Sequence, residues 1–326
     1  MQAFCHALPD DQVSVVAGRI RGGRLAELGA HVQLCDMRRW RWRGAGRQRG
    51  IRGVAARVMN PLRRSLLPEY DVLIRFGGGA DLSRAVRAKT RLITSAGKPI
   101  TAQWMEGYQW FALEAPGNAA LVEPSIQTTL VPPPLQCLAA ESVRPRRPLL
   151  QIPGRFYLMV FNPYGAVKGV DDLREALRGA PYPIVWCYSR GTLAFDIPVD
   201  LCDHPGLIHL EDVAPEELRF LYENCLAYLC FSRNESFGWA IVDALQYSQA
   251  IVSRRIGVLT YPEAAKMPGV HLVAEDWKSP WEVSPRDPGP IPVRDLTFLS
   301  PSFFRSHLMA LIEASGSLSS MQRVRP

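Results

Sequence analysis

The stretch NESFGWAIVDAL, residues 234–245, decides how the second half of the chain is expected to fold. It follows the apolar run LAYLCFS (226–232), which predicts a buried strand, and its own second part has apolar residues at helical spacing. Glu235 therefore stands in a loop between a strand and a helix, and Gly238 stands where the helix begins. Ligands of open α/β sheets bind at the carboxyl ends of the strands, which is where this loop is expected to lie.

The start of this helix suits a phosphate group. The amides of Phe237 and Gly238 would point out of the helix N-terminus, where the partial positive charge attracts anions. Asp243 lies about a turn and a half further along and could accept hydrogen bonds from a vicinal diol such as a ribose. We therefore expect different roles for Glu235 and Asp243. The alternatives are a dipole-stabilised acid at the helix start for Glu235 and an exposed helix residue for Asp243.

The rest of the second half repeats this alternation of strand and helix. Apolar runs predict strands at 155–163, 182–189, 206–212, 226–232, 250–254 and 269–275. Helical patterns lie at 169–177, 214–225, 238–248 and 262–266. Several of the strands are apolar throughout, as parallel strands covered on both faces are. These features predict a doubly wound α/β domain over residues 152–285.

The first half has the same pattern in weaker form. Strands are expected at 12–18, 30–37, 71–77, 90–97 and 118–125, a helical stretch at 82–88, and a final helix at 301–315. A Pro-rich, basic segment over 131–148 is expected to connect two domains. The predicted organisation is an N-terminal Rossmann-like domain (1–135), a linker (136–151), a C-terminal doubly wound domain (152–300) and a helix with a tail (301–326).

The segment 206–263 resembles the donor-binding half of retaining glycosyltransferases of the GT-B fold, family-4 type. The family's signature is two acids eight positions apart around E-x-F-G; Glu235, Phe237 and Gly238 match it, and Asp243 replaces the second Glu. The resemblance implies an α/β fold of two Rossmann-like doubly wound domains facing a cleft. It also implies that Glu235 orients the donor sugar, that Asp243 holds the ribose, and that Ser236 belongs to the donor site.

A second match lies in FNPYGAVKGVDDLREAL, residues 161–177. Relatives supply two cations to the donor diphosphate here, and Lys168 with Gly169 fits the second of them. Asn162 stands where the family has an Arg and could donate a hydrogen bond but no charge. Arg190 or Arg255 would then supply the missing cation. The alternative for Lys168 is a solvated loop lysine.

Aromatic residues gather in ITAQWMEGYQWFALE, residues 100–114. By the resemblance this region would contribute to acceptor binding, where many relatives place a His that this chain lacks. Gln103 or Glu106 could replace that His. Such aromatic clusters are more often part of a core than of a site.

Charge is unevenly distributed between the two halves. Residues 1–150 contain 22 Lys and Arg against 11 Asp and Glu, and residues 151–326 contain 16 against 20. The stretch Arg38–Arg64 contains ten Arg, two Trp and no acid, so an anionic membrane surface is its favoured partner. A solvated loop is the next reading, and nucleic acid is the least favoured because no nucleic-acid motif accompanies the stretch.

Several classes of protein do not fit the sequence. No run reaches the roughly 20 apolar residues of a spanning helix, and the N-terminus lacks the pattern of a signal peptide. The seven Cys and six His lack metal-ligand spacing, so we expect reduced core cysteines, no metal and no cofactor. We therefore expect a cytoplasmic protein that is peripheral to the inner face of the membrane through its Arg-rich stretch.

The resemblance implies a retaining, metal-independent hexosyltransferase-like enzyme. It would move a sugar from a UDP- or GDP-linked donor to a glycan or lipid-linked acceptor, in cell-envelope or polysaccharide synthesis. The alternatives are a catalytically inactive GT-B protein that binds a nucleotide or sugar, and a basic nucleic-acid-binding protein. The active enzyme is the expected function, and the missing Arg, the Asp in place of Glu and the missing His are the features that support the inactive alternative.

Overall fold

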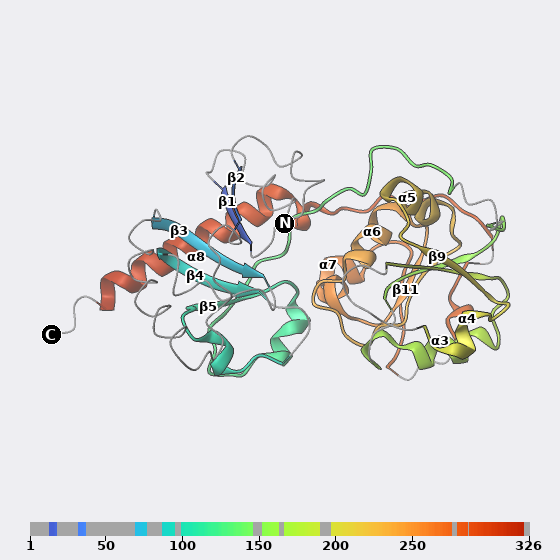
Figure 1. The fold of residues 1–326 in the computed structure, drawn as a ribbon, viewed down its shortest axis with the longest axis horizontal. Helices are drawn as coiled ribbons and strands as arrows, with labels where there is room; N and C mark the ends of the chain where they lie inside the picture. The colour runs from blue at the N-terminus through green and yellow to red at the C-terminus, as the bar shows by residue number, and fades with distance from the viewer. Residues whose placement is uncertain are drawn as a thin grey trace. The chain divides into compact units, whose positions relative to one another are not determined.

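The structure is a computed structural model of the 326-residue chain. It describes residues 13–17, 32–36, 69–76, 87–94, 99–145, 152–162, 166–189, 197–275, 279–285 and 287–322. The chain divides into two compact units, shown in Figure 1. The first unit contains Met1–Glu114, Asn118–Leu135 and Thr297–Pro326, and the second contains Ala115–Gly117 and Gln136–Leu296.

The second unit is built on a six-stranded sheet in which every neighbouring pair of strands is parallel. Its strands are β7 (Tyr157–Val160), β8 (Ile184–Tyr188), β9 (Leu207–Glu211), β10 (Tyr228–Cys230), β11 (Ile251–Ser253) and β12 (Val270–Leu272). Their order across the sheet is β12-β11-β10-β7-β8-β9. The chain thus adds strands outward from β7 and then returns to place β10 on the other side of β7. This reversal makes a topological switch point between β7 and β10.

Helices connect these strands, as the alternating pattern predicts. They are α3 (Val170–Leu177), α4 (Val199–Cys202), α5 (Pro215–Asn224), α6 (Trp239–Tyr247) and α7 (Pro262–Ala265), with short 3-10 helices η5 (Ala166–Lys168), η6 (Gly257–Thr260) and η7 (Pro280–Glu282). Figure 1 shows α3 and α4 on one side of the sheet and α5 and α6 on the other. Pro215 opens α5, and the Glu217 side chain accepts a hydrogen bond from the Ala214 amide at 3.2 Å.

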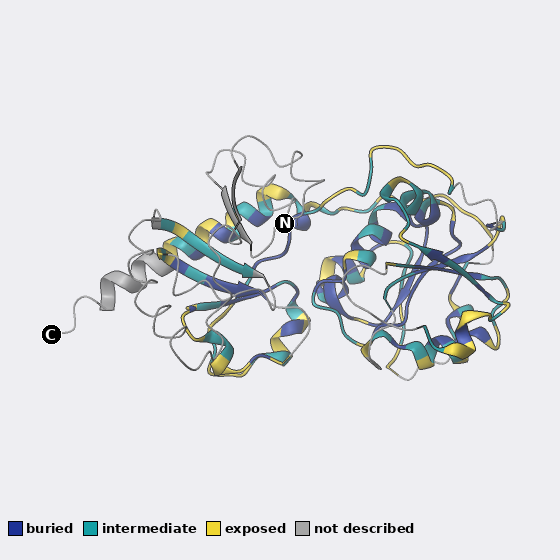
Figure 2. Ribbon diagram, viewed as in Figure 1, coloured by how far each residue is buried: buried dark blue, intermediate teal, exposed yellow. Residues whose placement is uncertain are grey.

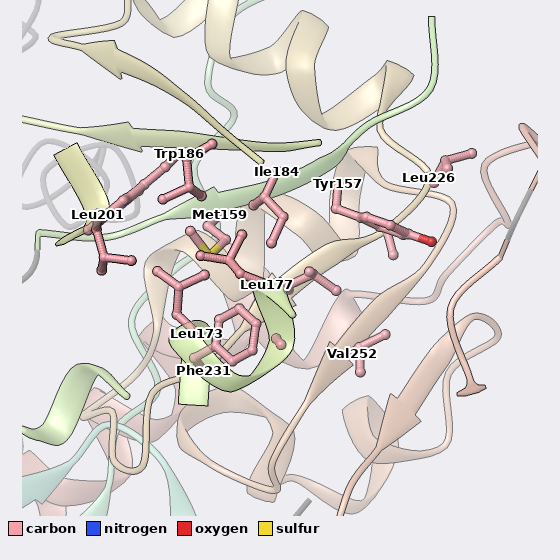
Figure 3. Close-up of a cluster of buried hydrophobic side chains, with 14 of the residues drawn as sticks. Tyr157, Met159, Leu173, Leu177, Ile184, Trp186, Leu201, Leu226, Phe231 and Val252 are labelled. Carbon is pink, nitrogen blue, oxygen red and sulfur yellow. The ribbon is translucent and has the colours of Figure 1, made fainter. Parts of the chain in front are cut away.

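The apolar strands of the second unit are buried on both faces. Tyr157 and Met159 of β7 pack with Trp186 and with Leu173 and Leu177 of α3 in one cluster, shown in Figure 3. Leu158, between them in sequence, is equally buried on the opposite face, because successive strand residues point to opposite sides. In Figure 2 the central strands are accordingly buried along their length. The predicted strands and helices of this unit are confirmed.

The first unit contains two parallel sheets. One pairs β1 (Val13–Ala17) with β2 (Val32–Asp36), and the other has the order β3-β4-β5-β6. The strands of the second sheet are β3 (Glu69–Phe76), β4 (Arg87–Thr94), β5 (Trp110–Leu113) and β6 (Thr128–Leu130). The remaining elements are η3 (Ala102–Met105), η4 (Pro116–Leu121), η8 (Thr297–Leu299) and the C-terminal helix α8 (Pro301–Gln322).

Helix α8 packs on the sheet of the first unit, although it follows the second unit in sequence. Phe304, Leu308 and Leu311 of α8 are buried against Leu92 of β4 and Ala112 of β5. Ile93 of β4 and Phe111 of β5 belong to a separate cluster, as expected when neighbouring strand residues point to opposite faces. The last helix therefore supplies one wall of the first unit's core.

Two predictions for the first half are wrong. Of residues 118–125, expected as a strand, 118–121 form the end of η4, and Val122 makes only an isolated bridge to Ile100. Residues 87 and 88, expected at the end of a helix, already belong to β4. The sequence analysis also missed β5, which lies within the aromatic stretch 100–114. Within the described ranges no helix is both long and apolar enough to span a membrane.

Candidate functional site

Lys168 and Glu235 meet at the switch point of the six-stranded sheet. Lys168 ends η5 in the connection after β7, and Glu235 lies in the loop after β10, the neighbouring strand. Lys168 Nζ donates to Glu235 Oε1 at 2.5 Å, and the two side chains are 12% and 19% exposed. Burying two charges to this extent costs desolvation free energy, which their attraction offsets only in a close, well-aligned contact. The pair is nevertheless in reach of solvent at the sheet edge where ligands bind.

A glycine makes this approach of the two loops possible. Gly169 has φ 66 and ψ 35, in the left-handed region, and caps the start of α3. A Cβ at this position would overlap the backbone carbonyl of Phe231, at the end of β10. Next to it, the Arg233 amide donates to the Val167 carbonyl oxygen at 2.7 Å. The Lys168 loop and the Glu235 loop are therefore joined backbone to backbone.

The residues at the start of α6 are anchored by a buried side chain and a backbone hydrogen bond. Phe237 is fully buried, and its ring lies 5.0 Å from that of Trp239. The carbonyl oxygen of Phe237 accepts a hydrogen bond from Val258 at 2.7 Å. Gly238 has φ 81, which a side chain would strain, and caps α6. The buried side chain of Phe237 thus anchors the loop. The N-terminus of α6 lies next to this anchor, beside the half-buried Ser236.

Asp243 lies in the middle of α6 and is half-buried. Burial raises the pKa of its carboxyl group to about 7, well above the ordinary value of 3.8. Among the described residues we find no hydrogen-bond donor or ion-pair partner for this carboxylate. A ligand hydroxyl would therefore relieve the desolvation of its ionised form.

A cavity of about 390 Å³ opens at the carboxyl ends of β7, β8 and β9. Its described lining includes Phe161, Tyr188 and Val213, together with polar groups of Asn162, Ser189 and Asp212. Asn162 Oδ1 accepts a hydrogen bond from the Ser189 amide at 2.9 Å, and Ser189 Oγ donates to Asp212 Oδ1 at 2.5 Å. Apolar walls with a few placed polar groups are typical of small-molecule sites.

Three of the remaining predicted site residues belong to the part of the chain that the structure describes. Gln103 and Glu106 are exposed residues of the first unit, at and just after η3. Arg255 is exposed just after β11. Arg190 and the stretch Arg38–Arg64 lie outside the described residues. Their predicted roles stay predictions.

Sequence reasoning missed one group of charges beside the pair. Arg254, which is 1% exposed, donates to Asp172 Oδ2 at 2.9 Å, and Arg233 contacts the same carboxylate at 3.0 Å. A charged residue after a strand usually lies on the surface, so the sequence carries no signal for the burial of Arg254.

Solved structures show where this architecture occurs. Sucrose-phosphate synthase from Thermosynechococcus elongatus is 13% identical to the chain at a TM-score of 0.55, over 99% of this chain and 91% of that one. The α,α-trehalose 6-phosphate synthase from Burkholderia multivorans is 11% identical at a TM-score of 0.51, over 93% and 88%. HepE from Anabaena, solved in complex with UDP and glucose, is 11% identical at a TM-score of 0.53, over 98% and 90%.

No protein-family model matches the chain, and no curated protein matches its sequence. At identities this low, the structural likeness is evidence for the fold alone. These solved structures are GT-B glycosyltransferases, and this chain, with its two α/β units and parallel sheets, has the GT-B fold.

Proposed function

We propose that the chain is a retaining glycosyltransferase that moves a sugar from a UDP- or GDP-linked donor to a glycan or lipid-linked acceptor. The observation that carries this proposal is the Lys168–Glu235 pair at the switch point between β7 and β10. The fold supports it, since the similar solved structures include synthases of sugar phosphates and a protein bound to UDP and glucose.

The pair would serve two ends of the donor. Lys168 would leave Glu235 for the donor diphosphate, because a phosphate oxygen is a strong acceptor for an ammonium group. Glu235, released from Lys168, would accept hydrogen bonds from hydroxyl groups of the donor sugar. The amides at the start of α6 would add partial positive charge, so that charge developing on the leaving diphosphate meets preorganised groups.

The nucleoside would lie beside the diphosphate. Asp243 would accept hydrogen bonds from the ribose, and the cavity at the ends of β7, β8 and β9 has the apolar walls and polar rim that a base needs. The acceptor roles of Gln103 and Glu106, and a membrane-proximal acceptor reached through Arg38–Arg64, are parts of the proposal that rest on the sequence.

Binding is tested by thermal shift with UDP, GDP, ADP and their sugar conjugates. We expect one nucleotide to raise the melting temperature of the wild type. Lys168→Ala should weaken its binding about 10- to 100-fold, the worth of one charged hydrogen bond. Lys266→Ala removes the same charge at an exposed position of the same unit and should leave binding unchanged. A wild type that no nucleotide stabilises at millimolar concentration would refute the donor site.

One observation favours a protein that binds a nucleotide sugar without transferring it. Asn162 stands where relatives have an Arg, and its Oδ1 already accepts the Ser189 amide. The two functions separate in a turnover assay: a transferase slowly hydrolyses its donor even without acceptor, and NMR of the released sugar shows the anomer first formed. Binding without any nucleotide release would favour the inactive alternative.

A further inference from the structure

Arg254 connects four loops at the ligand-binding edge of the second unit. It follows β11, and its guanidinium donates to the Phe231 carbonyl oxygen at 2.9 Å, at the end of β10. It also donates to the Glu275 carbonyl oxygen at 3.0 and 3.2 Å, beyond β12. Its contact to Asp172 at 2.9 Å reaches the first turn of α3, beyond β7.

Asp172 is shared between this buried arginine and an exposed one. Its carboxylate, 17% exposed, also accepts from Arg233 at 3.0 and 3.3 Å, and Arg233 is two residues before Glu235. Asp172 itself is four residues after Lys168 in the sequence. The two halves of the Lys168–Glu235 pair are therefore each connected, within a few residues, to one carboxylate.

The chemistry of arginine explains why it occupies this position. Its planar fork presents several donors in fixed directions, so one side chain can hold two carbonyl oxygens and a carboxylate at once. Lysine also has three donors, but they lie on one rotating nitrogen and lack the fixed, wide fork of the guanidinium group. Burying the charge of Arg254 costs free energy, and this cost is offset only where the guanidinium group has its hydrogen-bond partners. A buried arginine with several fixed partners therefore suits a role that requires a fixed geometry.

We propose that Arg254 is a positioning residue: through Asp172, Arg233 and the end of β10 it sets the separation of the Lys168 and Glu235 loops, and so the geometry in which the donor diphosphate is bound. The part of this statement that concerns the diphosphate rests on the proposed function. Because Arg254 is only 1% exposed, the proposal gives it no direct contact with the donor.

The variant Arg254→Met keeps an unbranched apolar side chain and removes the guanidinium group with its charge. It should still fold, because Asp172 keeps Arg233 as a partner. Arg294→Met is the matched control: Arg294 donates to the Ala244, Leu245 and Ser248 carbonyl oxygens at the other end of α6. That end lies about 13 Å from the start of the helix. Both variants should lose stability.

The first measurement is amide hydrogen exchange without any ligand. In Arg254→Met the Arg233 amide, bonded to Val167, should exchange at least about tenfold faster, because the local opening of its loop costs less. Arg294→Met should leave it unchanged, and Asp172→Asn should reproduce the effect of Arg254→Met. Unchanged exchange in Arg254→Met, or an equal rise in both arginine variants, would overturn the proposal.

The second measurement is the affinity for whichever of UDP, GDP and ADP the wild type binds most tightly. Arg254→Met should weaken it about tenfold, and should weaken it no further when Lys168 is already Ala, because the effect passes through Lys168. Additive losses would refute this coupling. If the wild type binds none of the three, the proposed function fails, and hydrogen exchange alone decides whether Arg254 positions the loops.

Discussion

Replacing Gly169 by alanine tests whether the two loops at the switch point need their close approach. Gly169 has φ 66, and a left-handed conformation costs a non-glycine residue about 1–2 kcal/mol. The new Cβ would also overlap the Phe231 carbonyl group, which belongs to the backbone and must shift. Overpacking of this kind costs about 1–3 kcal/mol. The expected loss of folding stability is therefore about 2–5 kcal/mol.

Urea unfolding followed by tryptophan fluorescence measures this loss, because Trp186 is fully buried in the second unit. The chain has two units, so the transition of the second unit must be resolved from that of the first. Gly154→Ala is the control: it adds the same methyl group at a glycine where a Cβ would meet no atom within 4 Å. If Gly169→Ala lies within about 0.5 kcal/mol of this control, the close-approach argument is refuted.

Three further predictions concern other parts of the structure. Because burial raises the pKa of Asp243 to about 7, the folded state loses stability as pH rises from about 4 to about 7. Asp243→Asn should therefore be more stable than the wild type at pH 8, by at most about 4 kcal/mol, and the difference should be smaller at pH 5. Urea unfolding of both proteins at the two pH values measures this difference. A difference in stability that grows toward low pH would contradict the prediction. Leu308 of α8 is 4% exposed, so Leu308→Ala should cost the first unit about 2–4 kcal/mol of stability in the same assay. The control Met309→Ala, at a residue that is 42% exposed, should cost less than about 0.5 kcal/mol. Arg219→Met removes hydrogen bonds to the carbonyl oxygens of Ala139 and Ala140 in the linker, at 2.6 and 2.7 Å. Thermolysin should therefore cleave the variant within 137–145 faster than it cleaves the wild type. Equal cleavage rates would show that Arg219 does not hold the linker.

The second unit could be predicted from sequence because each strand is a short apolar run between turn residues. The runs at 182–189 and 226–232 contain β8 and β10, and the flanking polar residues mark their ends to within a few positions. The rule of right-handed crossovers in parallel sheets limits the possible strand orders but does not select one of them. The first half offers no such contrast, and AALV at 119–122 is as apolar as a strand without becoming one.

The candidate site was only partly predictable. That Lys168 and Glu235 share an edge of the sheet follows from their places after two strands, but their direct contact depends on which strands are neighbours. Asp172 and Arg254 are 82 residues apart in sequence. Nothing in the local pattern of either residue indicates the other, because a buried ion pair depends on tertiary packing and leaves no periodic signal.

The charge at the switch point bears on whether the protein transfers a sugar or only binds one. Lys168 and Glu235 together carry no net charge, so an anionic diphosphate needs a cation beyond Lys168 or must rely on the amides at the start of α6. Arg255 is a candidate among the described residues: it is exposed just after β11, and a Cβ added at Gly257, two residues further on, would lie 3.1 Å from the Cβ of Glu235. Arg255→Ala should therefore weaken nucleotide binding about 10-fold or more if it is the second cation, and this would favour transfer. The same affinity in Arg255→Ala and in the wild type would exclude Arg255 from that role and would favour a site that binds its ligand through Lys168 and backbone amides.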